Sequence, residues 1–281
     1  MQVIQLSQDT TEQVRCWQRE GKRIGFVPTM GNLHAGHLRL VEIAKQKADC
    51  VVVSIYVNPM QFGKNEDFND YPRTLQTDLD KLKQLGVDLV FTPDNTSMYP
   101  QGVEQSSYVE VPDRLVAQLE GAQRPGHFRG VTTIVNKLFN IVQPDIAIFG
   151  EKDFQQLKAI QQMVADLNMP IIVHGEPTVR AADGLALSSR NQYLTTTQRK
   201  QAAMLYDTLE KLRERILLEN MDLTDLEQAA ILQLEQKGFD PDYVAIRNSD
   251  TLQEAASTSE PLIILAAARL GKTRLLDNLR V

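Results

Sequence analysis

The sequence predicts an α/β fold, with a parallel sheet in the longer first part of the chain and a smaller α+β region at the end. Up to about residue 177, short apolar runs alternate with longer stretches of helical periodicity, which is typical of parallel strands joined by crossover helices. After residue 184, two long helical stretches precede two strand-like runs. We therefore expect two domains, 1–178 and 179–281, with a linker near 177–184.

Each strand is predicted from a short apolar run, and each helix from apolar residues three or four positions apart. Helices are expected after residue 37, over 75–85, over 131–142 and after Asp153. Because ligands of parallel sheets bind beyond the carboxyl ends of the strands, the residues after each strand are the functional candidates. The expected strands are 24–29, 51–57, 87–91, 146–149 and 171–174, followed by helices over 197–219 and 223–237 and strands over 243–247 and 262–265.

The composition is that of a folded globular protein, since 42% of the 281 residues are hydrophobic and 23% are charged. The net charge of −6 argues against nucleic acid as a partner. No apolar run reaches the roughly 20 residues of a membrane helix, and the first residues lack a signal-peptide pattern, so we expect a cytoplasmic protein that binds no membrane. Cys16 and Cys50 are expected to be buried thiols rather than a disulfide.

The segment 28–37 sets two histidines three residues apart where the strand 24–29 gives way to a helix. Unpaired N–H groups at a helix start favour anions, and Gly31 and Gly36 allow the backbone to approach a ligand. His34 and His37 add directed donors. Helix capping is the alternative role, and zinc binding a weaker one, because no Cys, Asp or Glu stands nearby at ligand spacing. We predict a nucleotide-phosphate site.

Two further strand ends carry polar residues. Gln61 follows the strand 51–57 and the turn of Pro59, and its amide can contact a hydroxyl and a carboxylate together, unless it only closes its own turn. The strand 146–149 is followed by Gly150–Asp153, in which Gly150 can admit a phosphate and Lys152 can supply a positive charge. Asp153 is a plausible N-cap, and Gln156 lies one turn into the helix.

Three loops also carry residues of types that can bind phosphate. The loop 183–191 carries the hydroxyls of Ser188 and Ser189 and the guanidinium of Arg190, which suit a triphosphate. The alternative is that this loop only leads into the next helix. The basic segment 124–130 is expected to be a gate or an exposed turn. Gly271-Lys272-Thr273 looks like the end of a phosphate-binding loop, but position 266 is Ala where Gly is required, and the segment is expected to lie after the last strand.

Taken together, these motifs resemble the pantothenate synthetase family of pantoate–β-alanine ligases over nearly the whole chain. The resemblance rests on Pro28-Thr29-Met30-Gly31 with His34-x-Gly36-His37, Val57–Phe62, Arg124–Val131, Gly150–Asp153 and Ser188–Asn191. It implies a Rossmann-like domain of the nucleotidylyltransferase and class I synthetase type, followed by a C-terminal lid domain. It also implies that ATP and pantoate form pantoyl adenylate with loss of pyrophosphate, that β-alanine then displaces AMP, that Mg²⁺ accompanies ATP, and that the enzyme is a homodimer.

The resemblance also implies roles for single residues. His37 takes the position of the catalytic proton donor, and His34 and Lys152 stabilise charge beside it. Gln61 and Gln156 match the pantoate-binding glutamines, and Gln61 also matches the contact to β-alanine. Leu187 stands where many relatives carry Met. The implied ATP contacts are Met30, Gly31, Asn32, Leu33, His34, Ala35, Gly36, His37, Gly150, Glu151, Lys152, Asp153, Val179, Leu187, Ser188, Ser189 and Arg190.

Other functions fit part of the pattern. A nucleotidyltransferase of the same superfamily would keep the nucleotide in its product, whereas the ligase would release free AMP. A relative of class I tRNA synthetases would bind RNA, which the acidic composition disfavours. A nucleotide sensor without turnover would have no use for the two glutamines. The segment 124–130 and the second domain are our hypothesis for a lid that protects the reactive adenylate from water.

Overall fold

The computed structural model describes residues 1–64, 66–219 and 221–281. Packing divides the chain into two units. The first unit comprises Met1–Pro112, Arg124–Glu151 and Gln156–Pro177, and the second comprises Asp113–Gln123, Lys152–Gln155 and Thr178–Val281. The second unit thus includes two short segments from the first part of the chain, and the division into domains 1–178 and 179–281 stays a prediction.

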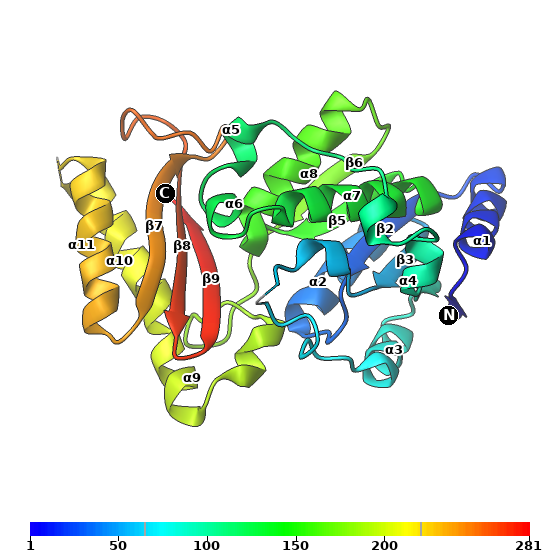
Figure 1. The fold of residues 1–281 in the computed structure, drawn as a ribbon, viewed down its shortest axis with the longest axis horizontal. Coiled ribbons are helices and arrows are strands. Elements are labelled where there is room, and N and C mark those ends of the chain that lie inside the picture. The colour runs from blue at the N-terminus through cyan, green and yellow to red at the C-terminus, as the bar shows by residue number, and fades with distance from the viewer. Residues whose placement is uncertain (65, 220) are drawn as a thin grey trace. The chain divides into compact units, whose positions relative to one another are not determined.

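Within its described residues, the first unit holds a six-stranded sheet in the order β1-β4-β3-β2-β5-β6, and all its strand pairs are parallel. Figure 1 labels four of these strands, β2, β3, β5 and β6. β2 lies between β3 and β5, with Phe26 opposite both Val52 and Ala147. The sheet order therefore reverses at β2, and such a switch point opens a crevice beyond the strand's carboxyl end. The strands are β1 (Gln2–Ile4), β2 (Ile24–Thr29), β3 (Cys50–Ile55), β4 (Leu89–Phe91), β5 (Ile146–Gly150) and β6 (Ile172–Glu176).

The central strands are apolar along their whole length because helices cover such sheets on both faces. Phe26, Val52 and Ile148 are fully buried. On one face of the sheet, Val41 and Ala44 of α2 share a core with Ile148. α7 buries an apolar face that includes Phe139. The helices of this unit are α1 (Ser7–Arg19), α2 (Ala35–Lys47), α3 (Leu75–Gln84), α4 (Asn95–Met98), α7 (His127–Val142) and α8 (Phe154–Asp166), with 3-10 turns at Pro59–Gln61 and Val103–Gln105. The first two residues of α8 belong to the second unit.

The second unit is built on an antiparallel sheet in the order β7-β8-β9, formed by β7 (Asp240–Asn248), β8 (Leu262–Leu270) and β9 (Thr273–Arg280). Alternate residues of β8, such as Ile264 and Ala266, share a core with Leu209 and Leu234 of two long helices. This unit also contains α5 (Asp113–Val116), α6 (Glu120–Gln123), α9 (Thr196–Ala202), α10 (Met204–Leu218), α11 (Leu223–Gln236) and a 3-10 helix at Ser189–Tyr193, and the 3-10 turn Glu151–Asp153 crosses between the units.

A buried ion-pair network, the Arg274 cluster, joins α6 to this sheet. Arg274 donates two hydrogen bonds of 2.7 Å to the carboxylate of Glu120 and one of 2.5 Å to Asp242. The hydroxyl of Tyr243 donates to the same carboxylate of Glu120 at 2.8 Å. Burial alone would lower the pKa of Arg274, but Glu120 and Asp242 raise it above its ordinary value. Arg274 therefore stays charged and fastens a segment from early in the chain to the C-terminal sheet.

The structure differs from the predicted elements at several places. β1 and β9 were not expected, so Gly271 and Lys272 form the turn into a further strand rather than a segment after the last one. The helix expected over 197–219 is divided into α9 and α10 at Ala203. Ala203 keeps α-region dihedral angles, which is why the apolar spacing continues through the break. The predicted strands of the first unit agree with the structure to within two residues at each end, whereas 243–247 and 262–265 cover only parts of β7 and β8.

The expectation that Cys16 is buried is also wrong. Cys16 is exposed, because α1 buries Thr10 and Val14, and residue 16 lies on another side of that helix; Cys50 is buried as expected. In segment 124–130, residues 124–126 form a turn with Pro125 and Gly126 exposed, and α7 begins at His127. No helix among the described residues is long and apolar enough to cross a membrane. The cytoplasmic location stays a prediction.

Candidate active site

The loop after β2 is held by a buried carboxylate from α3. Asp78 is inaccessible to solvent and accepts hydrogen bonds of 2.8 Å from the backbone N–H groups of Asn32 and Leu33. Gly31 and Asn32 have positive φ angles of 83° and 50°. A Cβ at Gly31 would lie 3.0 Å from Ile55 Cγ2 and 3.2 Å from Asp78 Oδ2, so the turn requires glycine. The conformation of the predicted phosphate loop is therefore fixed by contacts within the protein.

The two histidines begin α2 and contact its first turn. His34 is the N-cap, and its Nδ1 accepts a hydrogen bond from the N–H of Gly36 at 3.1 Å. His37 Nδ1 accepts from the N–H of His34 at 3.4 Å, and the ring centroids lie 4.1 Å apart. A nitrogen that accepts a hydrogen bond carries no proton, so each neutral ring carries its proton on Nε2. Capping thus fixes both tautomers and leaves Nε2–H as the donor of each ring.

Gln61 lies in the 3-10 turn after β3, and its amide is oriented by Asn58. The N–H of Met60 donates to Asn58 Oδ1 at 3.3 Å, and the hydroxyl of Tyr99 donates to the same oxygen at 2.7 Å. Asn58 Nδ2 is therefore the donor to Gln61 Oε1 at 3.1 Å. Gln61 Nε2 then lies 3.2 Å from Met30 Sδ. A thioether is a weak acceptor, so this amide N–H can still serve a substrate oxygen.

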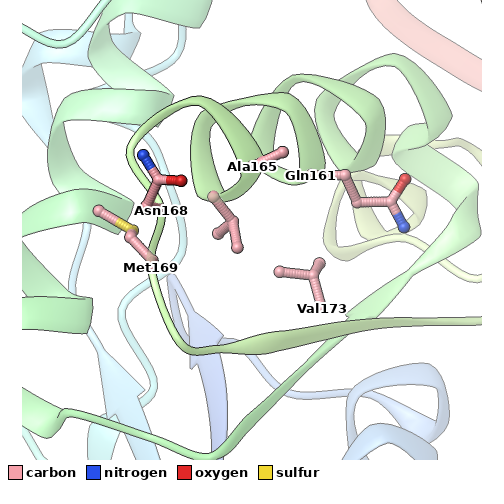
Figure 2. Close-up of a pocket in the computed structure, with 6 residues that line it drawn as sticks. Gln161, Ala165, Asn168, Met169 and Val173 are labelled. Atoms are coloured by element: carbon pink, nitrogen blue, oxygen red, sulfur yellow. The ribbon is translucent and has the colours of Figure 1, made fainter.

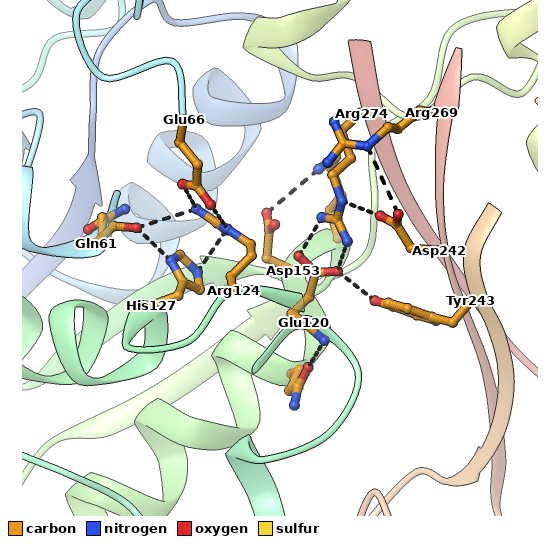
Figure 3. Close-up of polar contacts among 12 residues, drawn as sticks. Gln61, Glu66, Glu120, Arg124, His127, Asp153, Asp242, Tyr243, Arg269 and Arg274 are labelled. Carbon is orange, nitrogen blue, oxygen red and sulfur yellow. Dashed lines mark hydrogen bonds and ion pairs between the residues drawn. The ribbon is translucent and has the colours of Figure 1, made fainter. Parts of the chain in front are cut away.

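The predicted gate segment is fastened to the same turn by the Arg124 cluster, formed by Glu66, Arg124 and His127 (Figure 3). Arg124 Nε and Nη2 each donate to the carboxylate of Glu66 at 2.7 Å. His127 Nδ1 lies 2.9 Å from the carbonyl oxygen of Gln61. Burial alone would raise the pKa of Glu66, but Arg124 lowers it below its ordinary value. These contacts fix Arg124 and His127 to the 3-10 turn, while Pro125 and Gly126 form an exposed turn between them. The gate and lid roles of segment 124–130 stay predictions.

The end of β5 leads through the 3-10 turn Glu151–Asp153 into α8. Gly150 lies opposite Glu176 of β6 in the sheet. Gln156 is half-buried near the start of α8. Its neighbour Gln155 is buried and donates to the carbonyl groups of Leu115 and Gln118, so the two glutamines belong to different units.

In the second unit, strand β9 brings several predicted ATP contacts together. Leu187 N–H donates to the carbonyl oxygen of Val179 at 3.0 Å. Between them in the sequence, Arg180 pairs with both carboxylate oxygens of Asp277 at 2.6 and 2.9 Å. Burial raises the pKa of Asp277, although Arg180 opposes the shift. The next residue of the strand, Asn278, donates to the carbonyl oxygen of Lys152 at 2.8 Å, so one strand end anchors both Lys152 and the hairpin of Val179 and Leu187.

The loop 188–190 has a structural role in addition to the predicted one. Ser188 caps the 3-10 helix Ser189–Tyr193, and its hydroxyl accepts from the N–H of Arg190 at 3.3 Å. Asn191 Nδ2 donates to the carbonyl oxygen of Ala186 at 3.0 Å. The helix-start alternative thus describes the fold of this loop, and the ATP contacts of Ser188, Ser189 and Arg190 stay predictions.

A pocket of about 390 Å³ lies between α8 and β6 in the first unit (Figure 2). None of the predicted site residues lines it. Within the ranges that the structure describes, no three His, Cys, Asp or Glu side chains gather as a metal site, so His34 and His37 have no third protein ligand for zinc there. The pocket is lined by Gln161, Val164, Ala165, Asn168, Met169 and Val173.

Sequence reasoning missed the residues that hold the loops. Asp78 lies 46 residues beyond Asn32, in a helix with no sequence signal for such a contact. Asn58 lies in the motif Val57–Phe62, but the sequence assigns it no role of its own. Asp277 and Asn278 lie in β9, a strand that the sequence does not predict. The missed residues thus position the predicted contacts, and they become visible only when the chain is folded.

Comparison with known proteins places these features in context. A family model described as pantoate-beta-alanine ligase matches residues 2–280. The crystal structure of pantothenate synthetase from Thermus thermophilus is 43% identical, covers 99% of each chain and has a TM-score of 0.92. A crystal structure of pantoate-beta-alanine ligase from Francisella tularensis, complexed with beta-gamma ATP and beta-alanine, is 34% identical, covers 100% of this chain and 97% of that chain, and has a TM-score of 0.84. These similarities confirm the predicted fold class.

Proposed function

Because this chain belongs to the pantoate–β-alanine ligase family, we propose that it joins pantoate to β-alanine through pantoyl adenylate, with release of pyrophosphate and then of AMP. The observation that carries the proposal is the 3.2 Å contact of Gln61 Nε2 with Met30 Sδ. This contact places the amide of Gln61, which is predicted to bind the acid, beside the loop that is predicted to bind the nucleotide. An acid-activating ligase needs this neighbourhood, because the substrate carboxylate must reach the α-phosphorus of ATP.

In the first half-reaction, the carboxylate of pantoate attacks the α-phosphorus and pyrophosphate leaves. The carboxylate is ionised near neutral pH, so no general base is needed. Charge builds up on the phosphoryl and leaving oxygens, where fixed donors are most effective. We assign this role to the Nε2–H groups of His34 and His37, with His37 as the proton donor, and to the charge of Lys152. Gln61 and Gln156 bind pantoate.

ATP is held by the loop Met30–His37, by Gly150–Asp153, and by Val179 with Leu187–Arg190. The Francisella tularensis relative, which was crystallised with beta-gamma ATP and beta-alanine, supports ATP and β-alanine as substrates. Mg²⁺ would arrive with the phosphates of ATP, whose oxygens are the ligands it prefers, and would neutralise their charge.

In the second half-reaction, the amine of β-alanine attacks the acyl carbon of the adenylate, and the bond to AMP breaks. The ammonium form must first lose a proton to become a nucleophile. Gln61 orients β-alanine as well as pantoate. The family resemblance also supports a homodimer, which light scattering tests directly.

The decisive experiment is incubation with ATP, Mg²⁺ and pantoate, with and without β-alanine. We expect pyrophosphate without β-alanine, and free AMP with pantothenate once β-alanine is added. A product that keeps the nucleotide covalently bound would instead identify a nucleotidyltransferase. Absence of pyrophosphate in the reaction without β-alanine would overturn the adenylate intermediate.

A further inference from the structure

The Arg124 cluster converges on one atom of the proposed pantoate site, the carbonyl oxygen of Gln61 (Figure 3). His127 Nδ1 lies 2.9 Å from this oxygen, and Arg124 Nη2 donates to it at 3.3 Å. A carbonyl oxygen has two lone pairs, so these two donors can occupy both. The main chain at Gln61 is therefore fixed from the side of α7.

Arg124 is engaged within the cluster rather than offered to a substrate carboxylate. Its Nε and Nη2 bind the two oxygens of Glu66 at 2.7 Å each, and its Nη1 lies 3.0 Å from His127 Nε2. Because Arg124 lowers the pKa of Glu66, that carboxylate is ionised at neutral pH and neutralises the guanidinium. A bidentate pair of this kind is directional as well as strong.

The same contacts fix the tautomer of His127. A carbonyl oxygen only accepts, so Nδ1 of His127 carries the proton that it shares with Gln61. A guanidinium only donates, so Nε2 of His127 accepts from Arg124. The imidazole therefore relays the fixed position of Arg124 to the main chain of Gln61.

Backbone packing supports the same connection. A Cβ at Gly130 would lie 2.4 Å from Met60 O and 2.7 Å from Gln61 Cα, so the first turn of α7 approaches the 3-10 turn as closely as glycine allows. Asn58 Nδ2 donates both to the carbonyl oxygen of Gly130 and to Gln61 Oε1. The start of α7 thus fixes the main chain of Gln61, while Asn58 fixes its side chain.

We propose that His127 and Arg124 are positioning residues, which set the amide of Gln61 for the hydroxy acid and so control affinity for pantoate rather than for ATP. This inference rests on the proposed function, in which Gln61 binds pantoate. Loss of the contact to Gln61 is expected to raise the KM for pantoate about tenfold, as for one hydrogen bond, with little change in the KM for ATP.

Two variants of His127 form a matched pair. In His127→Asn, the side-chain amide can take the place of Nδ1 and still donate to Gln61, whereas the contact with Arg124 is lost. In His127→Gln, the longer amide reaches the place of Nε2 and loses the contact with Gln61. Each variant loses one hydrogen bond, so a purely structural role predicts equal effects. We expect the KM for pantoate to rise about tenfold in His127→Gln and less than about threefold in His127→Asn.

Pantoate-dependent pyrophosphate release and thermal unfolding are measured for both variants and for the wild type. Equal values of the pantoate KM in the two variants, or a parallel rise in the KM for ATP, would overturn the inference. If either variant folds poorly, Arg124→Lys replaces it, since lysine keeps the charge beside Glu66 but cannot supply the guanidinium fork; an unchanged pantoate KM there would also overturn it. An inactive wild type would show instead that the proposed function is wrong.

Discussion

The Arg124 cluster of the first unit and the Arg274 cluster of the second unit each contain a bidentate arginine–carboxylate pair (Figure 3). The Arg124 cluster ends on the carbonyl oxygen of a predicted substrate-binding residue. The Arg274 cluster ends on Tyr243 and Asp242, which have no predicted role in the reaction. The two arginine–carboxylate pairs are therefore similar, but they connect to different groups. The role of each pair depends on the residue to which it is connected.

The largest effect is expected from the Arg274 cluster, in stability alone. Glu120→Gln would leave a buried guanidinium with Asp242 as its remaining carboxylate in the cluster. Breaking a buried pair costs about 3 kcal/mol of unfolding free energy, which urea denaturation measures. The KM for pantoate should be unchanged in the folded variant. Arg269→Gln is the control, because its exposed side chain lies 4.0 Å from Asp242 and its loss should cost less than about 1 kcal/mol.

The second-largest effect is expected at His37, where a substitution can keep the helix-capping contact while it removes the proposed catalytic donor. In His37→Asn, the amide oxygen can replace Nδ1 as acceptor for the N–H of His34, but no Nε2–H remains. We expect about a 100-fold loss of pantoate-dependent ATP–pyrophosphate exchange, as when an oxyanion donor is removed, with the melting temperature retained. His37→Ala should lose the same activity and also some stability. Exchange at the wild-type rate in His37→Asn would refute the proton-donor role.

A third effect tests whether the Arg124 cluster also stabilises the fold. The pKa of Glu66 lies below its ordinary value of 4.5, so its carboxylate contributes stability above that pH and loses it as the pH falls through the lowered pKa. Glu66→Gln should be about 1 kcal/mol less stable than the wild type at pH 7. In unfolding measurements, this difference should shrink as the pH falls below 4.5. A constant difference across that range would contradict the assignment.

The smallest effect is expected at the surface. Asp183 and Arg199 form an exposed pair at 2.6 Å in the second unit, and Arg199 lowers the pKa of Asp183. Water and salt weaken such pairs, so Asp183→Asn should change the unfolding free energy by less than about 0.5 kcal/mol. The change should disappear at high salt. A cost comparable with that of Glu120→Gln would show that burial does not account for the contrast between clusters.

The parts of the fold that the sequence predicts are those with a local signal. The apolar run that becomes β2 has the predicted bounds, 24–29, because a strand buried on both faces must be apolar throughout. At the start of α7 the local sequence is misleading, because Gly126 and Gly130 suggest a loop where the helix begins. The reason for Gly130 is tertiary: any side chain there would meet the backbone of Met60.

The candidate site divides in the same way. Residues proposed to touch substrates lie in short motifs after strands, and the sequence alone indicates them. Residues that hold those motifs come from distant elements, such as Asp78 for the loop of Asn32, and Asn278 for Lys152. A carboxylate in a helix or an amide in a strand has no distinctive spacing, so only the folded chain reveals its partner.

The interleaving of the two units limits how the protein can be divided. A fragment that begins at residue 179 would lack Asp113–Gln123 and Lys152–Gln155, which belong to the second unit. It would leave Arg274 without Glu120 and Asn278 without the carbonyl group of Lys152. The C-terminal sheet therefore depends on segments synthesised much earlier, and any attempt to exchange it between relatives must transfer three pieces of chain together.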